Sequence, residues 1–101
     1  MSMQVDVQTA PRDGAAVRLG IALRLRRLEL GLSQRQVVRL LGLSAHSNLG
    51  DYERGERIPP GDIVDACEQL LAAEPGSFQS LRREALHERA HRICARDTAR
   101  T

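Results

Sequence analysis

Two short helical patterns lie close together in the middle of the chain, and this arrangement limits the fold more than any other feature of the sequence. The first pattern opens at Ser33, which with Gln36 three positions later forms the signature of a capping box. It ends at Gly42, because glycine is the usual residue at the left-handed end of a helix. The second pattern follows at once, with Ser44 as its expected N-cap and Gly55 at its end. The sequence therefore predicts two short helices joined by a tight turn.

The rest of the chain is also predicted to be helical. One helix is expected from about Ala15 to Leu30, another after Pro60, and a last one from Ser77 to about Ala95. The first of these has two apolar stripes, and a helix that is apolar on two sides is expected to be buried between neighbours. The stripes are Leu19, Leu23 and Leu30, and Ile21, Leu25 and Leu28; the expected apolar side of the helix after Ser33 is Val37, Val38, Leu40 and Leu41. No segment alternates as a strand would, so the sequence predicts an all-α fold.

The chain is expected to divide into three parts within one domain-sized unit of 101 residues. Residues 1–14 are predicted to be a flexible N-terminal arm, because Pro11 and Gly14 interrupt any regular pattern. Residues 15–76 are expected to form the helical domain. Residues 77–101 are expected to form a C-terminal helix that packs on the domain with its first part and is a candidate for dimerisation with its charged later part.

The composition indicates a small cytoplasmic protein. Hydrophobic residues make up 42 %, but Tyr52 and Phe78 are the only aromatic ones, so the core must be aliphatic. No apolar run approaches the length of a membrane span, and the N-terminus lacks the pattern of a secretory signal. Cys67 and Cys94 form no motif, and free thiols in a reducing compartment are expected. We therefore expect a cytoplasmic location and no membrane partner.

Positive charge is concentrated in the middle of the chain. The net charge is +2, but residues 18–60 carry eight arginines against four acidic residues, whereas residues 1–17 and 61–101 each have a net charge of −1. Every Lys or Arg position is an arginine, a side chain that suits phosphates and base edges. We expect that a GC-rich genome, which favours arginine codons, accounts for most of this preference over lysine, so the distribution of charge is more informative than its type.

Two short helices joined by a glycine-containing turn fit a helix-turn-helix, in which the first helix crosses the DNA backbone and the second lies in the major groove. Polar side chains on the first helix and at the helix ends are then candidates for phosphate contact. Polar side chains on the outer face of the second helix are candidates for base contact. The phosphate candidates are Gln34, Arg35, Arg39, Ser44, Arg54 and Arg57, and the base-facing candidates are His46, Ser47, Asn48 and Asp51.

The segments "LRLRRLELGLSQRQVVRLLGLS" and "LGDYERGERIPP" resemble the Cro/C1-type helix-turn-helix domain of the XRE family, from roughly Gly20 to Leu71. The resemblance implies a five-helix bundle of the lambda-repressor-like type, with the DNA-binding domain in residues 15–76. It implies a sequence-specific transcriptional regulator that binds double-stranded DNA, commonly as a dimer, with its third helix, about residues 45–54, in the major groove. It also implies phosphate contact by Gln34 and base contacts around Ser47 and Asn48.

Arg27 lies on an apolar stripe and needs a carboxylate, because an unpaired buried charge is costly. The family pairs an arginine of helix one with the glutamate of its Tyr-Glu motif, so the resemblance implies a structural ion pair between Arg27 and Glu53. The chain departs from the family pattern by one additional residue between Gly42 and Tyr52. This departure leaves the register of the base contacts open.

Two other classes of function were weighed against DNA binding. An enzyme is not expected, because the sequence contains no nucleophile–base pair, metal cluster or phosphate loop, and no cofactor is expected. His87, His91 and Cys94 share one helical face, but a mixed polar face is favoured over a metal site because no fourth ligand lies nearby. The alternative function is a protein-interaction or adaptor module, either antitoxin-like or the N-terminal domain of a larger signalling protein. A homodimer and a protein partner are therefore both candidate assemblies.

Overall fold

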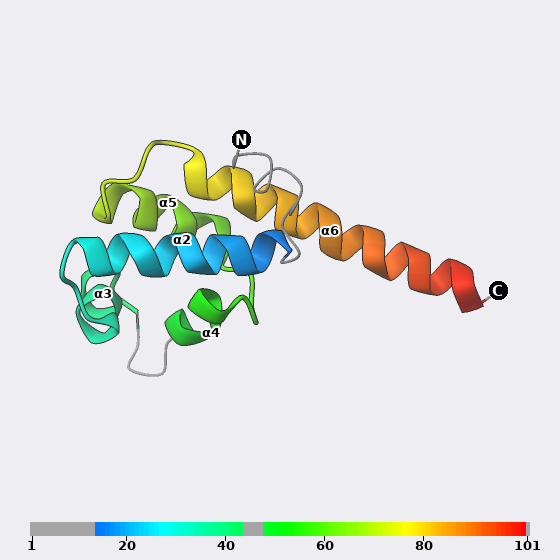
Figure 1. The fold of residues 1–101 in the computed structure, drawn as a ribbon, viewed down its shortest axis with the longest axis horizontal. Coiled ribbons are helices and arrows are strands. Elements are labelled where there is room, and N and C mark those ends of the chain that lie inside the picture. The colour runs from blue at the N-terminus through cyan, green and yellow to red at the C-terminus, as the bar shows by residue number, and fades with distance from the viewer. Residues whose placement is uncertain (1–13, 44–47, 101) are drawn as a thin grey trace, which may run out of the picture.

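The computed structural model describes residues 14–43 and 48–100, the last of these (94–100) through their backbone only. Within these residues the chain forms five helices and no strand, so the all-α prediction is confirmed (Figure 1). The helices are α2 (Ala15–Glu29), α3 (Gln34–Leu40), α4 (Leu49–Arg54), α5 (Gly61–Leu70) and α6 (Ser77–Arg100). None of the helices in the described part is long and apolar enough to cross a membrane.

Local sequence signals determine the ends of the first two helices. At the start of α3, Ser33 Oγ accepts a hydrogen bond from the Gln36 amide at 3.0 Å, and Gln36 Oε1 accepts one from the Ser33 amide at 2.7 Å. The predicted capping box is therefore confirmed. Gly31 and Gly42 follow α2 and α3 with φ angles of 70° and 72°, a conformation that only glycine adopts without strain.

In the described residues helix α4 starts at Leu49, with Asn48 at its N-cap position. The sequence predicted a start near residue 45 with Ser44 as the N-cap, and residues 44–47 lie outside the described part of the chain. Leu49 and Tyr52 are buried one turn apart and hold the helix on the core.

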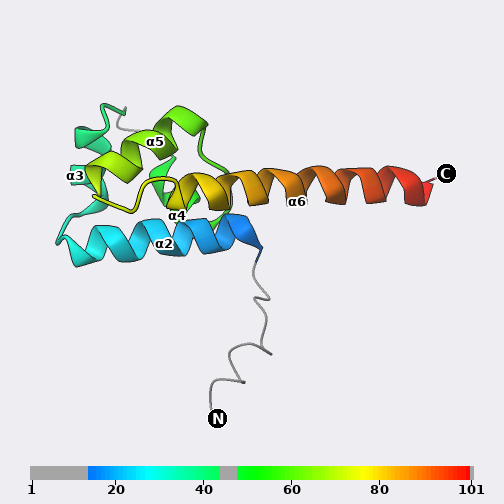
Figure 2. The same cartoon turned by 90° about the horizontal axis from the view of Figure 1, so that it is seen from above.

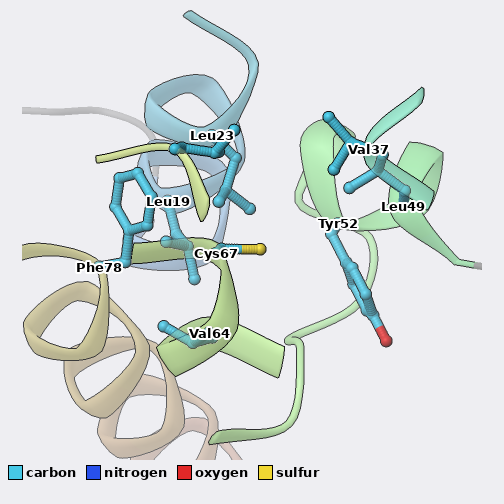
Figure 3. Close-up of a cluster of buried hydrophobic side chains, with 9 residues drawn as sticks. Leu19, Leu23, Val37, Leu49, Tyr52, Val64, Cys67 and Phe78 are labelled. Carbon is cyan, nitrogen blue, oxygen red and sulfur yellow. The ribbon is translucent and has the colours of Figure 1, made fainter. Parts of the chain in front are cut away.

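A small aliphatic core joins all five described helices. Its buried members are Leu19, Leu23, Val37, Leu49, Tyr52, Val64, Cys67, Leu71 and Phe78 (Figure 3). Helix α2 contacts both α4 and α6, and α5 contacts α6. The approach of α2 to α4 is close at Gly20, where an added Cβ would lie 2.4 Å from the carbonyl oxygens of Tyr52 and Glu53. Helix α2 is therefore the central support of the fold.

The second apolar stripe of α2 is not buried, which corrects the expectation that neighbours would cover both sides of this helix. Ile21, Leu25 and Leu28 are 44 %, 55 % and 50 % exposed. The reason is that α4 and α6 both approach the other side of α2, so no described element covers this stripe. Leu40, which was expected on the buried side of α3, is also exposed.

Helix α6 runs antiparallel to α2 and continues past its beginning (Figures 1 and 2). Arg18 pairs with Glu84 at 2.6 Å, and the Ala15 amide donates to Glu88 Oε1 at 2.9 Å. Phe78 and Ala85 are buried, so the first half of α6 packs on the domain. The helix extends to Arg100, several residues beyond its predicted end, and its second half projects away from the bundle.

A buried carboxylate that sequence reasoning missed holds the start of α6. Glu68 on α5 accepts hydrogen bonds from the backbone amides of Gly76, Phe78 and Gln79 at 2.9, 3.0 and 2.9 Å. These amides have no partner within α6, because the first amides of a helix never do. Glu68 therefore caps α6 from a neighbouring helix and joins the last two helices of the fold.

Candidate nucleic-acid interface

A buried ion pair sets the relation between the two short helices. Arg27 Nε and Nη2 donate to Glu53 Oε2 and Oε1 at 2.7 and 2.9 Å, and both residues are 7 % exposed. Arg27 Nη1 also donates to the carbonyl oxygen of Leu32, just before α3. The hydrogen bonds that Arg27 donates to Glu53 raise the pKa of the Arg27 guanidinium above its ordinary value. The structure thus brings together the two side chains that the resemblance implied would pair.

The side chain of Gln34 extends this network from the first residue of α3. Its Nε2 donates to Glu53 Oε1 at 2.8 Å. The sequence indicated Gln34 as a phosphate contact but did not indicate this bond, because nothing in the spacing of residues 34 and 53 requires it. The network consequently links α2, the start of α3 and the last turn of α4, so the two short helices are held as one unit.

The outer face of α3 carries unneutralised positive charge. Arg35 and Arg39 lie one turn apart and are exposed. Among the described residues, neither guanidinium has a hydrogen-bond or salt-bridge partner. These two arginines can therefore bind an anionic surface without first breaking an ion pair with a described carboxylate.

An open hollow of about 710 Å³ lies between α3 and α4. Its lining mixes the arginines of α3 with apolar side chains and with the outer residues of α4. The lining residues are Gln34, Arg35, Val38, Arg39, Leu43, Leu49, Gly50, Asp51 and Arg54. The two helices of the motif thus share one concave, partly cationic surface.

The far end of α4 differs from the outer face of α3, because its charges neutralise one another. Asp51 accepts hydrogen bonds from Arg54 Nη2 at 2.5 Å and from Arg57 Nε at 2.9 Å. Arg54 also pairs with Glu56 at 3.2 Å, and these contacts, led by the one to Glu56, raise the pKa of the Arg54 guanidinium. Arg54 and Arg57, two of the four arginines expected at phosphates, are therefore both bound to carboxylates in the free protein.

The base-facing candidates are only partly covered by the structure. Asn48 lies exposed at the N-cap of α4, and its side chain makes no capping bond. Asp51 lies on α4 in the charge cluster described above. His46, Ser47 and the phosphate candidate Ser44 lie outside the described residues.

The described residues include no group of three or more His, Cys, Asp or Glu side chains arranged to hold a metal ion. His87 and His91 lie on the surface of α6, and the side chain of Cys94 is outside the described part. Cys67 is buried in the core, where burial raises the pKa of its thiol to about 11. It is therefore a neutral thiol at ordinary pH.

One comparison with known proteins gives a match. A family model described as "Helix-turn-helix domain" matches residues 18–85, more than half of the chain. The matched span contains α3, α4 and the Arg27–Glu53 pair, together with nearly all of α2 and the packed part of α6. No curated protein and no solved structure matches the chain.

Proposed function

The chain belongs to the helix-turn-helix domain family, and from that premise we propose that it is a regulator of transcription that recognises a specific sequence in double-stranded DNA. The observation that carries the proposal is the Arg27–Glu53–Gln34 network. It holds α3 and α4 as one unit while Arg35 and Arg39 stand exposed beside them, with no ion-pair partner in the described part of the chain. A rigid pair of helices with free cations on its outer face is what docking on a duplex requires. The proposal includes no catalytic step and no cofactor, and it assumes a cytoplasmic location.

In the proposed complex, α4 lies in the major groove and α3 lies along the phosphate backbone. Arg35 and Arg39 make the main phosphate contacts, because they need not give up another partner. Further phosphate contacts come from Gln34, Ser44, Arg54 and Arg57. Base contacts come from His46, Ser47, Asn48 and Asp51 around the start of α4.

Net charge supports the same orientation. The excess of arginines lies in residues 18–60, which contain both helices of the motif, whereas the flanking parts of the chain are slightly acidic. A cationic surface of this kind raises the rate of encounter with DNA and makes binding dependent on salt. Binding through this surface should therefore weaken as the ionic strength rises.

We also propose that the protein binds DNA as a homodimer. Helix-turn-helix proteins that bind as dimers place their two subunits on two DNA half-sites about one turn of the double helix apart. The projecting half of α6 is available for such pairing, because it extends beyond the bundle. Light scattering at tens of micromolar protein, with and without DNA, tests this part of the proposal, and a monomer under both conditions contradicts it.

A second candidate function is a protein-interaction or adaptor module, as in an antitoxin or in the N-terminal domain of a larger signalling protein. The exposed stripe of Ile21, Leu25 and Leu28 favours it, because apolar side chains in a row on a small protein commonly mark a protein contact. DNA binding and a protein partner are compatible, since the stripe is on α2 and the arginines are on α3.

Selection of bound duplexes from a random pool at about 0.15 M salt tests the proposal, because non-specific binding is weak there. We expect an enriched palindrome, whose half-site spacing gives the geometry of the dimer.

The charge-reduced variant R35Q/R39Q should lose binding to the enriched duplex. The matched variant R83Q/R89Q, which removes two exposed arginines from α6, should retain it. If a folded protein enriches no sequence, the interaction module becomes the better explanation.

A further inference from the structure

We infer that Asp51 is an internal counter-ion that restrains Arg54 and Arg57 and thereby lowers binding to non-cognate DNA. The inference rests on the proposed function. It concerns the charge cluster at the far end of α4, which consists of Asp51, Arg54, Glu56 and Arg57. The sequence indicated both arginines as free phosphate contacts, and the structure places both of them on the same carboxylate.

The geometry makes Asp51 the centre of the cluster. Its Oδ1 accepts from Arg54 and its Oδ2 accepts from Arg57, so each carboxylate oxygen holds one arginine. The Asp51 side chain is 29 % exposed, whereas those of Arg54 and Arg57 are 58 % and 60 % exposed. Asp51 is thus the more enclosed partner, and the two arginines close over it from the solvent side.

The backbone supports the same arrangement. The amides of Glu56 and Arg57 both point to the Asp51 carbonyl oxygen, at 2.9 and 3.4 Å, as the chain turns through Gly55. This turn is left-handed, with a φ of 77° at Gly55. Because the turn brings residue 57 back beside residue 51, the contact between Arg57 and Asp51 follows from the backbone path and does not depend on a long side chain reaching across the surface.

The cluster carries no net charge, since its two arginines face two carboxylates. A DNA phosphate that approaches Arg54 or Arg57 meets a guanidinium whose charge is already offset by Asp51 or Glu56, and it is repelled by that carboxylate. The gain from such a contact is smaller than the gain at Arg35 and Arg39, whose guanidiniums have no described partner. Within the two helices of the motif, the arginines without a described partner are therefore those of α3, and the end of α4 contributes little to sequence-independent attraction.

Removing the carboxylate should consequently strengthen binding to any duplex and make it more dependent on salt. Each additional phosphate contact steepens the dependence of log K on log salt by about 0.9. Release of Arg57 alone would steepen it by about 0.9, so the loss of affinity between 50 and 200 mM salt would grow by about threefold. If Arg54 also leaves Glu56, its remaining partner, the change in slope would be up to about 1.8 and the loss would grow by about tenfold. Specificity, as the ratio of cognate to random binding, would fall.

The experiment measures affinity for a fluorescent duplex of random sequence by anisotropy at several salt concentrations. Asp51→Asn keeps the shape of the side chain, and Asp51→Ala lacks an amide that could hydrogen-bond a base. Glu29→Gln is the matched control, because it makes the same change in net charge at an exposed position on α2. We expect a steeper salt dependence and higher affinity for both Asp51 variants and no change in slope for the control.

The triple variant D51N/R54Q/R57Q identifies the origin of the effect, because it removes the arginines that Asp51 is inferred to restrain. Its slope should return to the wild-type value. If the Asp51 variants and Glu29→Gln have the same slope, or if the triple variant stays as steep as Asp51→Asn, the inference is overturned. Failure of the proposed function would look different, because neither the wild type nor any variant would then bind a duplex at low salt.

Discussion

Replacing Arg27 by alanine should destabilise the protein more than any other single loss of charge on α2. The substitution removes two hydrogen bonds to Glu53 and one to the carbonyl oxygen of Leu32, at a site where both charged residues are 7 % exposed. Glu53 would then remain buried, and Gln34 would be its only side-chain donor among the described residues. Removing one partner of such a pair costs about 3–5 kcal/mol, which is a large share of the roughly 5–15 kcal/mol that a small domain has in total.

Urea unfolding followed by far-UV circular dichroism measures the change in the free energy of unfolding. Arg24→Ala is the control, since Arg24 is exposed on the same helix, and its loss should change stability by no more than about 0.5 kcal/mol. The double variant R27M/E53L should recover much of the loss, because an apolar pair leaves no unpaired charge in the core. Equal stability of Arg27→Ala and Arg24→Ala would refute the reasoning about burial. A double variant no better than Arg27→Ala would show that packing, and not an unpaired Glu53, causes the loss.

Further predictions concern other contacts of the fold. Gly20→Ala should lower the free energy of unfolding by at least about 1–3 kcal/mol, because the added Cβ meets the backbone of α4. Gly50→Ala should raise the free energy of unfolding by up to about 1 kcal/mol, because its added Cβ meets only the flexible side chain of Arg54. The melting temperatures of the two variants should therefore shift in opposite directions. Glu68→Ala should remove hydrogen-exchange protection at the first amides of α6 while the amides of α3 stay protected. In a Cys94→Ser background, Cys67 should resist alkylation at pH 8 until the protein unfolds. Its raised pKa also predicts that the stability it contributes is complete below pH 9 and declines as pH rises through about 11.

The sequence predicted local features well because their causes are local. The capping box at Ser33 and Gln36 needs only residues three positions apart, and the left-handed glycines end helices for reasons that hold in any context. The pairing of Arg27 with Glu53 is not local, since 26 positions separate them. It was implied by the resemblance to a known family, and periodicity alone indicated only that Arg27 needed some carboxylate.

The features that sequence reasoning missed depend on which elements become neighbours. Periodicity showed that α2 is apolar on two sides, but it could not show that both contacting helices would lie on one side and leave Ile21, Leu25 and Leu28 exposed. Glu68 looked like an ordinary helical acid, because the amides that it caps belong to the next helix. Asp51 and Arg54 are three positions apart, a spacing at which opposite charges pair on a helix, so this contact of the charge cluster could have been predicted from the sequence.

The position of α2 has a consequence for function as well as for stability. Helix α2, which supplies none of the proposed DNA contacts, holds α3 and α4 together through Arg27 and approaches α4 closely at Gly20. A change at either residue should alter the angle between α3 and α4 before it unfolds the domain. We therefore expect Arg27→Ala and Gly20→Ala to weaken DNA binding at temperatures where circular dichroism still shows folded protein. Affinity measured well below the melting temperature of each variant tests this coupling. Variants that bind DNA like the wild type while folded would show that α3 and α4 keep their relation without α2.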